Sequence, residues 1–320
     1  MLILHDFDYR RPQTLGDALA LLGEYGDRAS PMAGGTDLVV NMKYRSILQL
    51  VEGAGSDQAR FPAARRVRPM VQPDVVVSLA DLPGLDGVTE TDDVWSVGPM
   101  MTMARFAERP DVPPAVCALR DATGVMGSPL IRNRATIGGN LVNARPAADT
   151  AVAILALGGR LELASAKGRR WVEIASYFTG PGMCVRRPDE LLIAIELPCS
   201  PTAGSAYLRQ GTRRQLEIAL VGAAAWVELD SATGKVAAAR IALGAVAPTP
   251  ILALQAAGSL VGQEPAPETL AAAAALARQE ARPIDDFRGS AAYRLGLIEV
   301  LVRRSLERAV ARAQGEGGAL

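Results

Sequence analysis

The sequence is poor in the residues that build metal centres and nucleophilic active sites. Its 320 residues include one histidine, His5, and three cysteines, Cys117, Cys184 and Cys199. A single histidine argues against a histidine-based metal site and against a Ser-His-Asp triad. The cysteines are too far apart for a CxxC or iron–sulfur pattern. We therefore interpret them as free thiols in a reducing compartment, and we expect no metal in this chain.

Net charge and long apolar runs are also missing. Lysine plus arginine and aspartate plus glutamate each number 34, which argues against bulk nucleic-acid binding and against an anionic membrane as the main partner. No apolar run reaches the roughly 20 residues that span a bilayer. Charged residues follow the apolar residues 1–4 at once, so we expect no signal peptide and a cytoplasmic protein. With 49% hydrophobic residues, the chain can bury the cores of two or three domains.

Two glycine turns stand out in what the sequence does contain. Residues 31–40 read PMAGGTDLVV and residues 135–149 read ATIGGNLVNARPAAD, so each has a Gly-Gly pair beside a threonine and a polar side chain. Glycine pairs let the backbone adopt φ > 0, and successive N–H groups then form a concave site for phosphate oxygens. We interpret the turns as two walls around a diphosphate, with Asp149 placed to accept a hydrogen bond from a ribose or an adenine. Neither turn fits GxGxxG after a first strand or GxxxxGK[ST], so a Rossmann site and a P-loop are not supported.

An α+β organisation is predicted around these turns. Thr14 with Asp17 indicates a capping box for a helix that runs to about Gly23. A strand at 28–32 leads into the first turn, and a short helix at 37–42 follows it. The other elements predicted before residue 179 are strands at 75–79, 93–98 and 160–164 and helices at 113–122 and 150–157.

A third unit is predicted from about residue 179. Its strands, joined by hairpins, indicate an antiparallel sheet followed by helices. We therefore predict a cofactor-binding region at 1–178, with subdomains of about 1–51 and 73–178. A C-terminal unit at 179–313 and a frayed tail at 314–320 follow it. The strands of the third unit are expected at 190–197, 205–210, 219–229 and 236–245, and its helices at 250–258, 266–281 and 290–313.

The arginine-rich stretch 52–72 reads as an insertion-like surface loop between the two subdomains. Two interpretations remain open for it, a mobile insertion or a basic contact patch for a partner.

Four motifs, in order along nearly the whole chain, resemble one known family. The family is the FAD-binding medium subunit of molybdenum hydroxylases, the relatives of xanthine dehydrogenase, aerobic carbon monoxide dehydrogenase and 4-hydroxybenzoyl-CoA reductase. The motifs are AGGTDL at 33–38, TIGGN at 136–140 with Asp149 downstream, ELLIAIELP at 190–198, and SAYLRQGTRR at 205–214 followed by EIA at 217–219.

The resemblance implies the fold, the cofactor and the partners. FAD would lie across two N-terminal α+β subdomains of the vanillyl-alcohol-oxidase (p-cresol methylhydroxylase) type, and a C-terminal antiparallel sheet with helices would follow. A large subunit would carry molybdopterin and a small subunit would carry [2Fe–2S] clusters, in a dimer of heterotrimers. This chain would pass electrons between those clusters and an external acceptor or donor. It would hold no catalytic acid or base for the organic substrate.

The resemblance also implies the residues that bind FAD. Ser30, Pro31, Met32, Ala33, Gly34, Gly35, Thr36 and Asp37 would form the first diphosphate loop. Thr136, Ile137, Gly138, Gly139 and Asn140 would form the second, in which the Thr136 and Asn140 side chains would add donors to the N–H groups of both glycines. Asp149 would bind the adenosine part, Leu192 would touch the flavin region, and Arg209 would place a positive charge near the isoalloxazine. Arg209 stands where relatives of the xanthine dehydrogenase branch have lysine, which changes the geometry of that charge.

One departure from part of the family concerns an extra cluster. In the 4-hydroxybenzoyl-CoA reductase branch and in some aldehyde oxidoreductases, a cysteine-bearing segment after the second glycine motif binds a [4Fe–4S] cluster. Residues 141–149 contain no cysteine, so we predict no cluster in this subunit. Two alternatives remain, a scaffold subunit with a degenerate flavin site and a self-contained flavoenzyme of the same cofactor fold, such as an enolpyruvyl-sugar reductase.

Overall fold

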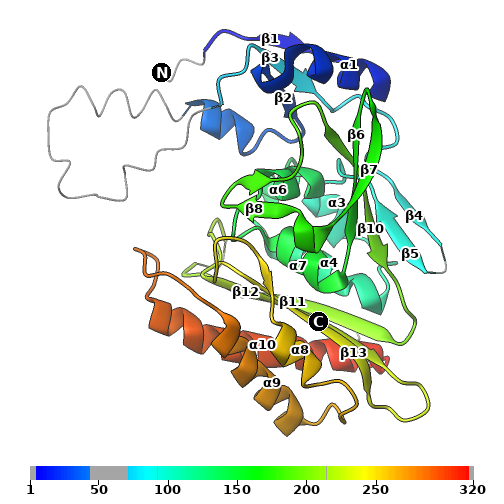
Figure 1. Cartoon of the computed structure of the whole chain (residues 1–320), viewed down its shortest axis with the longest axis vertical. Helices are drawn as coiled ribbons and strands as arrows, with labels where there is room; N and C mark the ends of the chain where they lie inside the picture. Colours follow the sequence, from blue (N-terminus) through cyan, green and yellow to red (C-terminus); the bar gives the residue numbers. More distant parts are fainter. Residues whose placement is uncertain (1–4, 44–70, 92, 214, 317–320) are drawn as a thin grey trace, which may run out of the picture.

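The computed structural model describes residues 5–43, 71–91, 93–213 and 215–316. The three larger of the four β-sheets in the described residues follow one another along the long axis of the molecule, from the N-terminal sheet at the top of Figure 1 to the C-terminal sheet at the bottom. Helices lie against and between these sheets, and the predicted α+β class is confirmed. Most of the arginine-rich stretch 52–72 lies outside the described residues, as does part of the predicted tail.

The first sheet is small and parallel. Its strand order is β1 (Asp8–Arg10), β3 (Val75–Ser78) and β2 (Ala29–Met32), so that β2 delivers the first glycine turn from a sheet edge. Helix α1 (Leu15–Tyr25) begins as predicted, because the Thr14 hydroxyl accepts a hydrogen bond from the Asp17 N–H at 3.1 Å. Ala18, Leu19 and Leu22 of α1 are buried against this sheet, as one apolar helical face requires.

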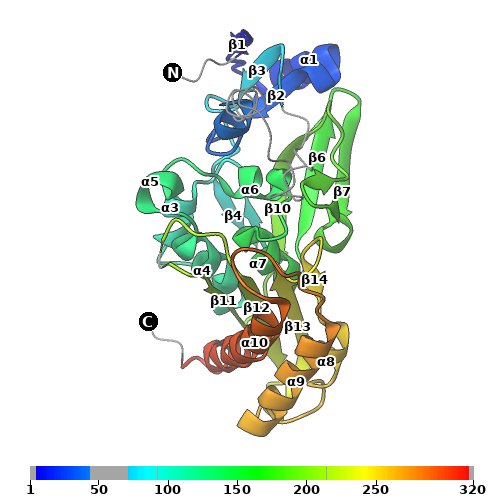
Figure 2. The ribbon, with the colours of Figure 1, turned by 90° about the vertical axis from the view of Figure 1, so that its left-hand side faces the viewer.

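The second sheet is antiparallel and contains five strands in the order β4-β5-β10-β6-β7. Helices α3, α4, α6 and α7 pack beside it and share one apolar core with it. Figure 2, which turns the molecule by 90°, shows α6 on the side of the N-terminal sheet and α7 on the side of the C-terminal sheet. The bounds are β4 (Val88–Glu90), β5 (Val94–Val97), β6 (Arg160–Ser165), β7 (Gly168–Glu173), β10 (Leu191–Pro198), α3 (Met103–Ala107), α4 (Cys117–Val125), α5 (Pro129–Arg132), α6 (Ile137–Asn143) and α7 (Asp149–Leu157), with the small hairpin β8 (Phe178–Gly180) and β9 (Met183–Cys184) nearby.

The third sheet has the order β11 (Ala203–Gln210), β12 (Val221–Leu229), β13 (Val236–Gly244) and β14 (Ile251–Leu252). Alternation along β12 sends Ala223, Ala225 and Val227 to one face and Ala224 and Trp226 to the other. Helices α8 (Leu254–Gly258), α9 (Pro267–Glu280) and α10 (Ala291–Ala313) cover the first face. Helices α4 and α7 of the second unit cover the other face, so the two units share a core.

The sheet pairing bears on the predicted boundary at residue 179. Strand β10 was expected in the third unit, but it pairs antiparallel with β5 and β6 of the second sheet. The strand itself was recognisable from its apolar run, whereas its partners, β5 and β6, are remote in sequence. We therefore propose that the C-terminal unit begins between β10 and Ala203.

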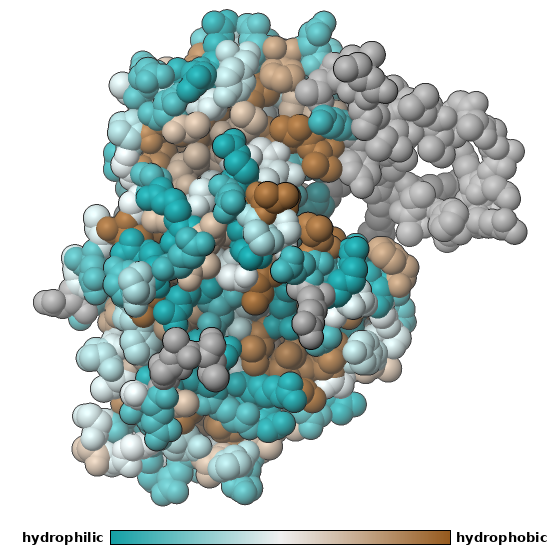
Figure 3. Space-filling model, turned by 180° about the vertical axis from the view of Figure 1, so that it is seen from behind, coloured by the Kyte–Doolittle hydropathy of each residue, from teal (hydrophilic) through white to brown (hydrophobic). Residues whose placement is uncertain are grey.

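The surface shows no broad apolar belt on the face in Figure 3, where hydrophilic and apolar side chains are mixed in small groups. Within the described ranges, none of the helices combines the length and the apolar character needed to cross a membrane. In the same part of the chain, no group of three or more His, Cys, Asp or Glu side chains could hold a metal ion.

Candidate functional site

The fold brings the two glycine turns into direct contact, although about a hundred residues separate them in the sequence. A Cβ atom on Gly34 would lie 1.9 Å from the carbonyl oxygen of Arg134, just before the second turn. A Cβ atom on Gly139 would lie 3.8 Å from the Cβ of Ala33. At Gly34 the approach leaves room only for a hydrogen side chain, whereas Gly139 and Ala33 are in ordinary van der Waals contact, so the two turns lie side by side.

The first turn keeps its backbone donors open. It leaves β2 after Met32, and a helix at 38–43 follows it in the described part of the chain. Gly35 has φ +75°, a conformation in which other residues are strained. Within the described residues, the N–H groups of Gly34, Gly35 and Thr36 donate to no protein acceptor. The turn can therefore offer several backbone donors to an anionic group, as its sequence predicts.

Asp37, at the end of the first turn, connects it to the segment after the second turn. Its carboxylate accepts a hydrogen bond from the Asn143 side chain and lies near the Arg145 guanidinium. Desolvation by the surrounding protein raises the pKa of the Asp37 carboxyl, and Arg145 and Asn143 oppose that rise, although the residue keeps an exposed surface. Neither Asn143 nor Arg145 was recognised from the sequence, where they read as part of the segment between TIGGN and Asp149.

The second turn uses its backbone donors internally. Thr136 caps helix α6, and its hydroxyl accepts a hydrogen bond from the Gly139 N–H at 3.0 Å. The Gly138 N–H donates to the Pro99 carbonyl at 2.8 Å, and a Cβ on Gly138 would lie 2.4 Å from the Pro99 ring. Both glycine N–H groups, predicted as phosphate donors, thus have protein acceptors. Gly138 serves close packing against Pro99, while Ile137 is fully buried in the core.

Asn140 presents a side-chain donor at the end of this turn. Its Oδ1 accepts a hydrogen bond of 2.6 Å from the hydroxyl of Thr150, which is fully buried in the first turn of α7. This contact orients the amide and leaves its NH₂ group directed away from Thr150. Thr150 was not singled out in the sequence, because it follows Asp149 in a run that reads as an apolar helix.

Asp149 and Arg209, both predicted to contact the cofactor, bind each other in the structure. The Asp149 carboxylate accepts hydrogen bonds from Tyr207 Oη at 2.6 Å and from Arg209 Nη1 at 3.1 and 3.2 Å. Arg209 Nη2 donates to the Glu217 carbonyl at 3.1 Å. The two side chains are only 5% and 8% exposed, so their direct contact with a ligand stays a prediction.

Burial dominates the electrostatics of this cluster. Desolvation raises the pKa of Asp149, while the Arg209 charge and the hydrogen bond from Tyr207 act against the rise. Burial also raises the pKa of Tyr207 well above its usual value, and the neighbouring carboxylate of Asp149 adds to that effect. Tyr207 therefore stays protonated and acts as a hydrogen-bond donor to Asp149.

Leu192 lies in strand β10 of the second sheet, where it pairs with Leu163 of β6. It is 5% exposed and belongs to the same apolar core as Ile137 and Leu141 of α6. Its place in β10 is consistent with support for the turn, and its contact with a flavin stays a prediction.

Comparisons with known proteins agree with this arrangement. The chain matches the family described as the FAD binding domain in molybdopterin dehydrogenase over residues 64–200, and the carbon monoxide dehydrogenase flavoprotein C-terminal domain over residues 206–309. It is 33% identical over 308 residues to the carbon monoxide dehydrogenase medium chain of Afipia carboxidovorans, covering 96% of this chain and 98% of that one. It is 32% identical over 320 residues to a putative xanthine dehydrogenase FAD-binding subunit of Escherichia coli, covering 98% and 99%.

Solved structures show the same likeness. A chain of the carbon monoxide dehydrogenase from Oligotropha carboxidovorans superposes with a TM-score of 0.83 at 32% identity, over 97% of this chain and 99% of the other. A chain of quinoline 2-oxidoreductase from Pseudomonas putida gives a TM-score of 0.81 at 28% identity, over 98% and 99%.

Proposed function

This chain belongs to the family of FAD-binding medium subunits of molybdenum hydroxylases, and from that premise we propose that it transfers electrons between the [2Fe–2S] clusters of a partner subunit and an external acceptor or donor. The family makes it an oxidoreductase subunit with an FAD-binding domain. The observation that carries the proposal is the contact between the two glycine turns, at Gly34 with Arg134 and at Ala33 with Gly139.

The two glycine turns carry hydrogen-bond donors that suit the diphosphate of FAD. The first turn, with the residues of β2 that lead into it, would offer the N–H groups of Gly34, Gly35 and Thr36 to the diphosphate. The second turn would add the Asn140 amide, while Thr136 holds the turn by accepting the Gly139 N–H. Leu192 would support this wall from β10.

Bound FAD would supply the exchange between one-electron and two-electron transfer, which no protein side chain here can supply. This chain would bind and orient the cofactor and set its electrostatic surroundings. The substrate would react elsewhere, at the molybdopterin of a large subunit, with a small [2Fe–2S] subunit between the two. We propose a dimer of such heterotrimers in the cytoplasm.

The test is a visible absorption spectrum of the purified full-length chain, before and after acid release of the cofactor. We expect a flavin spectrum, one releasable FAD per chain and no broad iron–sulfur shoulder. A colourless chain that takes up no added FAD would overturn the proposal in favour of a scaffold subunit. A brown chain would contradict the prediction that this subunit holds no cluster.

A further inference from the structure

Helix α7 connects the C-terminal sheet to the proposed FAD site. We propose that Asp149 and Arg209 are positioning residues, which set the affinity for FAD through Thr150 and Asn140 rather than by touching the cofactor. The inference rests on the proposed function, that FAD binds between the two glycine turns.

The first step is the direction of the Asp149 carboxylate. Both residues that bind it, Tyr207 and Arg209, come from β11 of the C-terminal sheet. Arg209 extends the contact to the Glu217 carbonyl in the loop after β11. Only 5% of the Asp149 side chain is exposed, and both of its carboxylate oxygens accept hydrogen bonds from Tyr207 and Arg209. The start of α7 is therefore fixed to the C-terminal sheet.

The second step is the neighbouring residue. Thr150 lies about 100° further round the same helical turn, and its hydroxyl donates to Asn140 Oδ1 at 2.6 Å. One turn of helix thus binds the C-terminal sheet through Asp149 and the second glycine turn through Thr150. A shift of this turn would move the Thr150 hydroxyl and free the Asn140 amide to rotate.

The opposite end of α7 provides a matched comparison. Arg240 of β13 donates to the Ala156 and Leu157 carbonyls at 2.8 and 2.9 Å, and its guanidinium lies 3.8 Å from the centre of the Trp226 ring. The same sheet therefore holds both ends of α7 with an arginine. The nine residues of the helix place the two ends about 13 Å apart, and the hydrogen bond to the glycine turn, from Thr150 to Asn140, lies at the first end.

The experiment measures the dissociation constant for FAD and the melting temperature of the FAD-free full-length chain. Thr150→Val removes the hydroxyl that orients Asn140, and we expect FAD affinity to fall about tenfold, the factor that one lost hydrogen bond can produce. Asp149→Asn should weaken FAD at least as much. Arg209→Lys, which keeps a cation beside Asp149, should retain more affinity than Arg209→Met. Arg240→Met should lower the melting temperature and leave the affinity unchanged.

A double variant separates positioning from direct contact. If Asp149 acts through Thr150, Asp149→Asn combined with Thr150→Val should weaken FAD by much less than the product of the two single effects. Independent effects, an unchanged affinity in Thr150→Val, or an Arg240→Met chain that loses FAD as strongly as Asp149→Asn would each overturn the inference. A wild-type chain that binds no FAD would instead overturn the proposed function and the inference with it.

Discussion

Gly34 is the residue at which the two glycine turns approach most closely. A Cβ at this position would lie 1.9 and 2.6 Å from the carbonyl oxygen and carbon of Arg134, and these backbone atoms cannot rotate aside. We therefore expect Gly34→Ala to separate the turns and to abolish FAD uptake, with a loss of about 1–3 kcal/mol in the free energy of unfolding. Acid-releasable flavin per chain and chemical denaturation measure the two effects.

Gly23→Ala is the matched control for this change. Gly23 lies on the exposed side of α1, and a Cβ there would meet nothing within 4 Å. This variant should bind FAD normally. It should unfold at a slightly higher denaturant concentration than wild type, because alanine favours a helix by about 1 kcal/mol over glycine. A Gly34→Ala chain with full flavin content would show that close contact between the turns is not needed.

Glu190 makes the free energy of unfolding depend on pH in the acidic range. The carboxylate is 2% exposed and accepts hydrogen bonds from Arg170 at 2.7 and 2.9 Å and from the Arg187 N–H at 2.7 Å. Burial alone raises its pKa, but the hydrogen bonds and charges of the arginines outweigh burial, so the pKa lies below its ordinary value of 4.5. The ionised form is therefore the one that stabilises the folded chain.

The sign of the pH dependence follows from this lowered pKa. The contribution of Glu190 is complete above the unfolded value of 4.5 and is lost as the pH falls through the folded value. Glu190→Gln should unfold more easily than wild type at neutral pH, and the difference should shrink as the pH falls below 4.5. Urea unfolding at several pH values measures it, with the exposed Glu264→Gln as control. An equal difference at every pH would contradict this role for Glu190.

At the scale of single residues, the sequence indicated the local turn and cap residues but not the contacts that they make with remote parts of the chain. The Gly-Gly pairs and Thr136 could be identified because turn and cap residues act locally. The hydrogen bond from Gly138 to Pro99 could not, since it depends on where β5 ends in the fold. The pairing of Asp149 with Arg209 joins residues 60 positions apart, and nothing in either local sequence specifies it.

Among the elements, strands and helices with clear periodicity were predicted well and their neighbours were not. Helices α1, α9 and α10 begin and end within two or three residues of their predicted bounds. Strand β7 was missed, because GRRWVE at the sheet edge carries charged residues that resemble a loop. The pairing of β10 with β5 and β6 was not predicted, since an apolar run indicates burial but not the sheet in which the strand lies.

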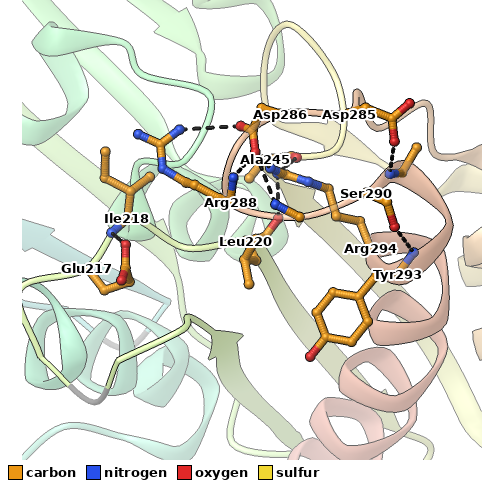
Figure 4. Close-up of polar contacts among 12 residues, drawn as sticks. Glu217, Ile218, Leu220, Ala245, Asp285, Asp286, Arg288, Ser290, Tyr293 and Arg294 are labelled. Carbon is orange, nitrogen blue, oxygen red and sulfur yellow. Dashed lines mark hydrogen bonds and ion pairs between the residues drawn. The ribbon is translucent and has the colours of Figure 1, made fainter.

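Arg294 connects the start of helix α10 to three loops. This arginine is 3% exposed and donates to the Leu220 carbonyl at 2.9 Å, the Ala245 carbonyl at 3.3 Å and the Asp286 carboxylate at 2.7 Å (Figure 4). We expect Arg294→Met to cost about 3 kcal/mol of unfolding free energy, because Asp286 loses a charged partner and the carbonyls of Leu220, buried, and Ala245, partly buried, lose a donor. Urea denaturation measures this loss.

Arg304→Met is the control on the same helix, since Arg304 is exposed. A substitution at an exposed helical position should change the free energy of unfolding by less than about 0.5 kcal/mol. Equal effects of the two variants would mean that the contacts of Arg294 in Figure 4 do not contribute to stability.

For the whole molecule, the contact between the second and third units is both apolar and polar. Leu119 and Ile154 of the second unit share one core with Tyr207 and Trp226 of the third. Arg312 of α10 adds a bidentate ion pair with Asp121 of α4, at 2.7 and 2.9 Å. A shared core of this kind makes separate unfolding of the two units unfavourable, because each would expose apolar surface that the other covers.

The N-terminal unit is joined to the rest in the same way. Ala164 of β6 and Leu191 and Ile193 of β10 complete the core beneath α1 and the first sheet. We therefore expect the chain to unfold in one calorimetric transition, although family comparison divides it into two domains. FAD should raise the temperature of that single transition by several degrees, since a ligand present at 100 times its dissociation constant adds about 2.7 kcal/mol of stability. Two transitions, of which FAD shifts only the first, would instead show that the C-terminal sheet unfolds independently of the cofactor site. The polar contacts at both ends of α7 would then be too weak to couple the C-terminal sheet to that site.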